Sequence, residues 1–262
     1  MNASDRPIPP DNPHPMNRYQ HLSQVPLLVF VFLLSACHKE EVEDVPLVVP
    51  HVESVTLGIE HHMDGVDLAN DTLLYYTVAG HNYSVSRLQY YLSEIVLQGT
   101  GSTPNDTIHG PYYVDGNRSF ALGIMTAGTY SGATLLLGLP PSINLTGGLP
   151  NTLENLNMAW PDPMGGGYHF IKFEGHFMNA DIPTGFAMHV GGNAYLPHAE
   201  LDQPLILDGR SGTLVIRFNL NELFRTPHTY DLATGNYSMG SMALMGQLRD
   251  NAADAFTIEY RP

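Results

Sequence analysis

Histidine is the side chain of this sequence most suited to metal chemistry. The chain has 13 histidines but only 11 lysines and arginines together, and neutral imidazole binds copper, zinc, iron and nickel. His61 and His62 are adjacent, so on a strand they point to opposite faces and only one can serve an interior site. Strand alternation places His189 on one face with Ala187 and Gly191. It places His169 on one face with Ile171 and Phe173.

A second candidate lies around Trp160, the only tryptophan of the chain. The segment 156-LNMAWPDPMGGGYHFIKFEGHF-177 places it near Met158, Met164 and His169, ahead of a predicted strand. A lone tryptophan is usually an ordinary core residue. Two distant histidines that converge on this segment would indicate a site.

Three methionines, Met239, Met242 and Met245, form the pattern Met-x-x-Met-x-x-Met. Thioethers are soft ligands that suit Cu(I). The same spacing is typical of a helix that buries flexible side chains in a core, and we favour that interpretation.

Composition argues against several classes of protein. A net charge of −15 disfavours binding to nucleic acid. The sequence contains no nucleophile elbow, Walker loop, dinucleotide-binding glycine motif or His-Glu-x-x-His helix. The single cysteine cannot form an internal disulfide. We therefore expect a binding protein and not an enzyme.

The N-terminal region predicts export. Residues 1–15 have the character of an upstream leader, and residues 16–36 read as a signal peptide with a short apolar core. The ending Leu34-Ser35-Ala36-Cys37 resembles a bacterial lipoprotein cleavage site, which would lipidate Cys37 and anchor the protein to a membrane of the cell envelope, in the periplasm or at the outer membrane. Residues 37–50 would be a tether, and residues 51–262 one folded domain.

The remainder of the chain predicts an all-β fold. Period-2 segments separated by Gly, Pro, Asn and Asp favour a β-sandwich of antiparallel strands with long loops and one or two short helices. The predicted strands lie within 52–63, 70–99, 111–116, 129–139, 168–177, 185–192, 204–209, 212–220 and 256–260. Residues 219–225 predict a single Asn-capped turn, residues 239–254 a helix, and residues 140–157 a long loop.

Six short blocks of the sequence carry a resemblance to a known family. The clearest is 83-YSVSRLQYYLSEIVL-97. The others are 57-LGIEHHMDGVDL-68, Gly128-x-Tyr130 with the strand after it, 158-MAW-160 with 167-GYHFIKFEG-175, 186-FAMHVGG-192 and 214-LVIRFNLNELF-224. In this order they resemble the MbnP family, periplasmic copper-binding proteins first linked to methanobactin operons and common elsewhere as lipoproteins.

The resemblance implies a β-sandwich that binds copper. Carried over by position, His61 and His189 are the candidate ligands, with His62, His169 and Met164 as further candidates. Trp160 is the candidate for oxidation to kynurenine, which in the family is attributed to a partner di-haem enzyme of the MauG type. This chain has Asp162 where the family has a second tryptophan, so a copper site here would depend on histidines, with Met164 or Met158 as an added ligand.

Three other functions compete with copper acquisition, storage or delivery. Trp160, Tyr168 and neighbouring tyrosines could form a stacking platform of a carbohydrate-binding or adhesion lipoprotein. The chain could also be a purely structural envelope lipoprotein. A calcium site near Asp64, Asp67 and Asp71 is a further alternative, although their spacing is not that of an EF-hand.

Overall fold

The computed structural model describes residues 49–262. The predicted leader, signal peptide and lipidation site at Cys37 lie outside the described residues, as does all but the end of the tether. They remain predictions. Within residues 49–262, no helix is both long and apolar enough to cross a membrane.

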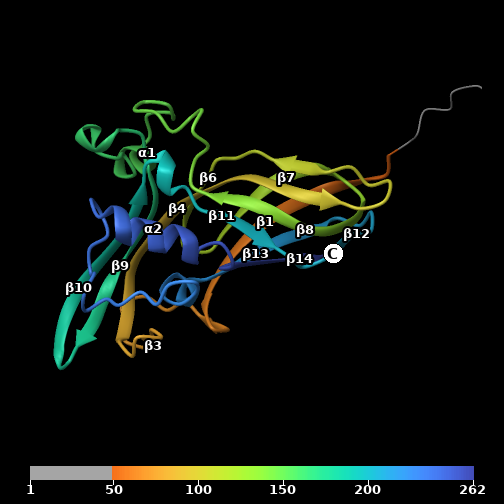
Figure 1. Ribbon diagram of the computed structural model, residues 1–262. Coiled ribbons are helices and arrows are strands. Elements are labelled where there is room, and N and C mark those ends of the chain that lie inside the picture. The colour runs from red at the N-terminus through yellow and green to blue at the C-terminus, as the bar shows by residue number, and fades with distance from the viewer. Residues whose placement is uncertain (1–48) are drawn as a thin grey trace, which may run out of the picture. The chain divides into compact units, whose positions relative to one another are not determined.

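Two β-sheets form most of this part of the chain (Figure 1). The first has the strand order β14-β13-β1-β2, with β7 paired to β1. Its strands are β1 (His51–Met63), β2 (Val66–Asp67), β7 (Arg118–Thr126), β13 (Gly212–Asn219) and β14 (Phe256–Arg261). One pair, β1 with β13, runs parallel, while the other pairs of this sheet are antiparallel.

The second sheet has the order β10-β9-β4-β8-β11, with β3, β5 and β6 paired to β4 and β12 to β8. Its strands are β3 (Tyr75–Tyr76), β4 (Asn82–Gly99), β5 (Asp106–Ile108), β6 (Tyr112–Asp115), β8 (Gly128–Leu137), β9 (His169–Asn179), β10 (Ile182–Gly191), β11 (His198–Leu201) and β12 (Leu205–Leu207). The 18-residue strand β4 is central and pairs with β8 and β9. The predicted all-β sandwich is confirmed.

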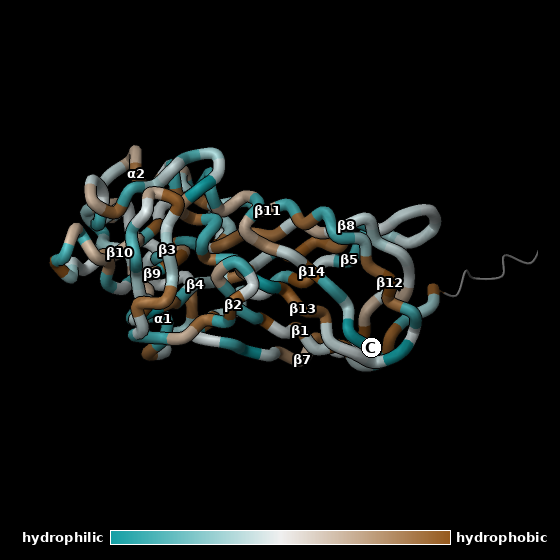
Figure 2. The backbone as a smooth tube through the Cα atoms, turned by 90° about the horizontal axis from the view of Figure 1, so that it is seen from below, coloured by the Kyte–Doolittle hydropathy of each residue, from teal (hydrophilic) through white to brown (hydrophobic). Residues whose placement is uncertain are grey.

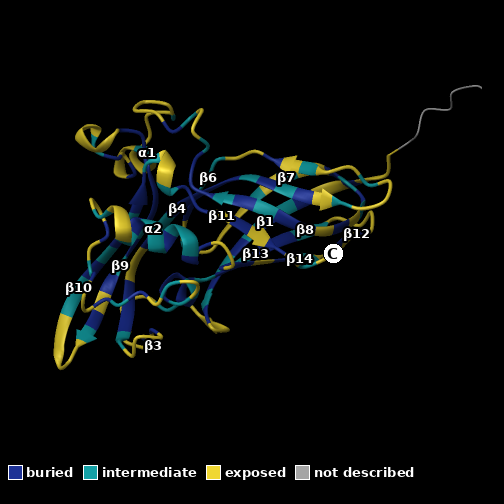
Figure 3. Cartoon of the chain, viewed as in Figure 1, coloured by how far each residue is buried: buried dark blue, intermediate teal, exposed yellow. Residues whose placement is uncertain are grey.

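Alternation of apolar and polar residues explains the strands. Buried and more exposed residues alternate along most of β1, whereas β13 has three consecutive buried residues before it alternates (Figure 3). Apolar residues recur along both strands (Figure 2). The core between the layers is aromatic, with Tyr83, Phe173, Phe218 and Phe224 fully buried. Many of these rings meet edge to face, which is the favoured arrangement for aromatic pairs.

The helices are short: α1 (Leu153–Asn157), α2 (Met242–Asn251) and the 3-10 turns η1 (Asp162–Met164), η2 (Asn193–Tyr195) and η3 (Leu220–Phe224). The predicted Asn-capped turn is confirmed, since the Asn219 side chain accepts a hydrogen bond at the start of η3. Helix α2 begins at Met242, where Ser241 caps it, and so is shorter than predicted.

The predicted buried stripe of three methionines is wrong. Met245 is buried, but Met242 is exposed and Met239 precedes the helix and is also exposed. The serine cap sets this boundary, because its hydroxyl accepts from the backbone N–H of Leu244. Met239 therefore belongs to a turn and has no place on the buried face of α2.

A β-bulge at Phe170 changes which residues share a face of β9. Val190 of β10 pairs with Ile171 of β9, but the next residue, Gly191, pairs with His169. Phe170 is the extra residue, fully buried and closely packed against Gly138. The bulge turns His169 to the face opposite Ile171, contrary to strict strand alternation.

Candidate metal site

The outward face of β9 and β10 brings two histidines together. The rings of His169 and His189 meet edge to face with centroids 5.0 Å apart. His189 lies on this face because its neighbours Met188 and Val190 point into the core. His169 joins it through the bulge at Phe170. The prediction that His169 shares a face with Ile171 is therefore wrong.

Backbone hydrogen bonding fixes the protonation of His169. Its Nδ1 lies 3.0 Å from the carbonyl oxygen of Met158. A carbonyl can only accept, so Nδ1 carries the hydrogen and Nε2 has a free lone pair. Burial, assisted by the nearby charge of Lys172, lowers the pKa of His169 to about 4. The ring is thus neutral at pH 7, which is the form that binds metals.

A carboxylate orients His189 in the same way. Its Nε2 lies 2.9 Å from Oε1 of Glu174, so Nε2 donates and Nδ1 keeps its lone pair. Burial lowers the pKa of His189, although the Glu174 carboxylate opposes this effect. The main chain of His189 is also held, because the Ser238 hydroxyl accepts from its N–H and donates to its carbonyl.

Glu174 remains charged while partly buried. Burial alone would raise its pKa, but hydrogen bonds and charge from His189 and Arg87 lower it overall. Nη1 of Arg87 lies 3.1 and 3.0 Å from the two carboxylate oxygens. A carboxylate that fixes the tautomer of an imidazole is a common partner of metal-binding histidines.

Trp160 packs against His169 of this pair. Its ring lies 4.7 Å from that of His169, centroid to centroid, and only 4 % of the residue is exposed. Its Nε1 donates to the carbonyl oxygen of Met164, 3.2 Å away. The indole lies directly against Gly191, where a Cβ atom would come within 2.4 Å of the ring. The glycine therefore allows the close approach.

His61 lies elsewhere, in the core between the sheets. It is 2 % exposed, and both ring nitrogens are paired: Nδ1 with Oδ1 of Asn117 at 2.9 Å, and Nε2 with the Tyr90 hydroxyl at 2.7 Å. No lone pair is left for a metal in this arrangement. Burial lowers the pKa of His61, so this ring is also neutral.

The structure does not bring His61 and His189 together. Tyr90 of β4 pairs with Ile171 of β9, which pairs with Val190 of β10, and paired residues share a face of a sheet. Tyr90 contacts His61 on that inner face. His189, adjacent to Val190, points to the outer face. The predicted convergence of His61 and His189 is therefore not seen, and the imidazole that meets His189 is His169.

The other residues predicted for a site have different positions. His62 is half-buried on β1, and its Nδ1 accepts from the N–H of Gly65. Met158 is fully buried beside His169, whereas Met164 is exposed at the end of η1. Among residues 49–262, no group of three or more His, Cys, Asp or Glu side chains is arranged to hold a metal ion. Further ligands at the histidine pair would need other donors, such as thioether sulfur.

Residues named for the two alternative sites are paired or buried. Nη2 of Arg225 lies 2.6 and 2.5 Å from the carboxylate oxygens of Asp64, and Asn219 and Asn221 also donate to that carboxylate. The Asp64 carboxylate is thus already paired with one guanidinium and two side-chain amides. Trp160 and Tyr168 are both buried, so they do not form an exposed platform on which a sugar ring could stack.

Sequence reasoning missed the roles of Glu174 and Ser238. Glu174 lies two residues after Lys172 within 167-GYHFIKFEG-175, and alternation alone places it on the outward face with His189. The alternation of the strand could therefore have identified Glu174 from the sequence. Ser238 follows an irregular segment that bridges to Ala187 on β10, which no pattern in the sequence indicates.

These features define an all-β sandwich with a histidine pair beneath its only tryptophan. The sequence model of one family, MbnP, matches residues 52–242. The chain therefore belongs to the MbnP family, as the resemblance predicted. Among solved structures it is similar to MbnP from Methylosinus trichosporium, at 13 % identity and a TM-score of 0.49, over 82 % of this chain and 100 % of that one. Comparison with curated proteins gives no match.

Proposed function

We propose that this protein binds a copper ion through His169 and His189. One observation carries the proposal: two neutral imidazoles lie 5.0 Å apart, each with one nitrogen engaged and the other free. The association of the MbnP family with methanobactin and copper supports copper over other metals that imidazole binds.

The surrounding residues would prepare the pair for binding. The Met158 carbonyl and Glu174 would hold the rings in place, and burial would keep both rings unprotonated. Copper would then displace few protons on binding. The role would be acquisition, storage or delivery of copper without catalysis, which agrees with the lack of catalytic motifs in the sequence.

We also propose that the protein acts in the bacterial cell envelope as a lipoprotein. The support is the sequence pattern that ends at Cys37. Metabolic labelling with palmitate should give a labelled protein, and Cys37→Ser should abolish the label. An unlabelled wild-type protein would refute the anchor without affecting the copper site.

Trp160 is the candidate for oxidation to kynurenine by a MauG-type di-haem partner. Its support is the ring contact of 4.7 Å with His169 and a border with a surface pocket lined by Pro161 and Tyr168. Intact mass of protein from the native host tests this, because kynurenine formation replaces one indole carbon by oxygen. An unmodified mass would refute the oxidation.

Copper titration of the apo protein tests the central proposal. Wild type should bind about one copper ion tightly, with quenching of fluorescence from Trp160, the only indole. His169→Ala and His189→Ala should lose this binding. His176→Ala is the matched control, since His176 is exposed on the same strand β9. Tight binding retained by both site variants would refute the assignment.

A further inference from the structure

Solvent-exposed methionines gather at one place in this protein. Residues 49–262 contain nine methionines, and the three with large exposed surfaces are Met164, Met239 and Met242, at 37, 38 and 74 %. Buried methionine needs no special explanation, because it fills gaps in cores. Three exposed methionines at one end of the molecule need an explanation.

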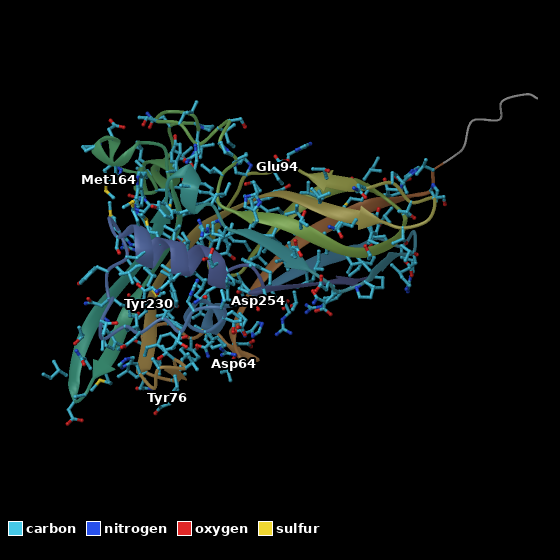
Figure 4. All side chains as sticks on the ribbon, in the orientation of Figure 1. Asp64, Tyr76, Glu94, Met164, Tyr230 and Asp254 are labelled. Atoms are coloured by element: carbon cyan, nitrogen blue, oxygen red, sulfur yellow. The ribbon has the colours of Figure 1, made fainter. Side chains whose placement is uncertain are left out.

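Local structure brings these three residues close to one another. Met164 ends the 3-10 turn η1, and its methyl carbon lies 3.9 Å from the position that a Cβ on Gly240 would take. Gly240 lies next to Met239 in a turn closed by a hydrogen bond from Ser241 N–H to the Ser238 carbonyl. Met242 is the first residue of α2. Figure 4 shows Met164 near the end of α2 opposite Asp254.

Both segments are attached to the histidine site. Ser238, adjacent to Met239, makes two hydrogen bonds to the main chain of His189. The carbonyl of Met164 accepts from the indole of Trp160, which packs on His169. The thioethers thus border β9 and β10, the strands that carry the proposed ligands His169 and His189.

We propose that Met164, Met239 and Met242 form a thioether surface that takes up Cu(I) and passes it to the histidine pair. Thioether sulfur is neutral and soft, so it favours monovalent Cu(I) over Cu(II) and over hard cations such as Ca²⁺. The flexible methionine side chain allows a ligand to change position as the ion moves. The transfer to histidine rests on the proposed function, whereas binding at the thioethers does not.

Silver(I) is a redox-inert probe for this surface. Protein labelled with ¹³C at the methionine methyl groups is titrated with Ag(I), and NMR follows all nine signals of the folded domain. The methyl signals of Met164, Met239 and Met242 should shift first. Met63 and Met125, buried in the first sheet, are internal controls and should stay unmoved.

Two variants separate the thioether surface from the histidine site. The triple variant Met164→Leu/Met239→Leu/Met242→Leu should lose the early Ag(I) response and take up Cu(I) more slowly. The control variant Met178→Leu, at a half-buried position on β9, should match wild type. His169→Ala/His189→Ala should keep the methyl shifts and lose tight copper binding.

The outcomes separate the two proposals. Methyl shifts without tight copper binding in wild type would support the thioether surface and refute the histidine site. A different set of results would overturn the thioether surface alone. In that case the wild type binds copper tightly, its methyl signals do not move, and the triple leucine variant takes up Cu(I) at an unchanged rate.

Discussion

Nε2 of His189 lies 2.9 Å from Oε1 of Glu174, and this contact determines which nitrogen of His189 is free. Glu174 is itself held by Arg87 on the same outward face. The direction of the imidazole therefore depends on a carboxylate that would not contact the metal.

Glu174→Gln tests that dependence. The variant removes the negative charge that orients His189, so copper affinity should fall by roughly 10–100-fold while the fold is kept. A competition titration against a copper chelator measures the change. Glu94→Gln is the control, because Glu94 pairs with the exposed His109 outside this site. Unchanged affinity in Glu174→Gln would show that the contact has no orienting role.

The low pKa of His169 predicts a pH dependence of stability. Its pKa is about 4 in the folded protein against 6.5 ordinarily, so between these values the unfolded chain binds more protons. The free energy of unfolding should therefore fall as pH decreases through this window, with a contribution from His169 on the order of 2–3 kcal/mol.

Urea unfolding across this pH window measures that effect. His169→Gln should unfold with a smaller dependence on pH than wild type. Part of the dependence should remain, because burial also lowers the pKa values of His61 and His189. His176→Gln, at an exposed position, should behave as wild type. An unaltered slope in His169→Gln would contradict the neutral buried ring.

Gly191→Ala should displace Trp160. An added Cβ would lie 2.4 Å from one indole carbon, so the ring must move, at a cost of about 1–3 kcal/mol. The emission spectrum reports the displacement directly, because Trp160 is the only indole. Gly246→Ala on α2 has open space and should be neutral or slightly stabilising. Equal behaviour of the two variants would refute the close packing.

His61→Ala separates a structural histidine from the proposed metal ligands. It leaves the Tyr90 hydroxyl and Asn117 without their partner, so stability should fall by about 1–3 kcal/mol. Copper stoichiometry at a temperature well below unfolding should remain that of wild type. Loss of copper from a variant that is still folded would restore His61 as a ligand.

The sequence allowed prediction of the strands with clear alternation, such as β1, β9 and β10. It did not indicate β7, because most of that strand is exposed, only Met125 is buried, and the alternation that includes Phe120 and Leu122 stops at Gly123. The place of His61 within the family resemblance favoured it as a ligand. The sequence could not reveal that Tyr90 and Asn117 pair with both ring nitrogens of His61. His189 was predicted as a ligand and His169 as a further candidate, but the pairing of the two was not predicted. The bulge at Phe170 depends on packing against Gly138, which lies far away in the chain.

The extra residue in β9 affects how other MbnP sequences should be compared with this one. The extra residue Phe170 changes which positions of β9 face outward on its N-terminal side. A relative without this residue must therefore carry its second imidazole one position closer to the equivalent of Ile171, so that the ring faces the equivalent of His189. An alignment column at His169 would then hold a core residue in one protein and an outward-facing histidine in the other. Spatial superposition of β10, and not column identity, is the sound criterion for recognising this pair elsewhere.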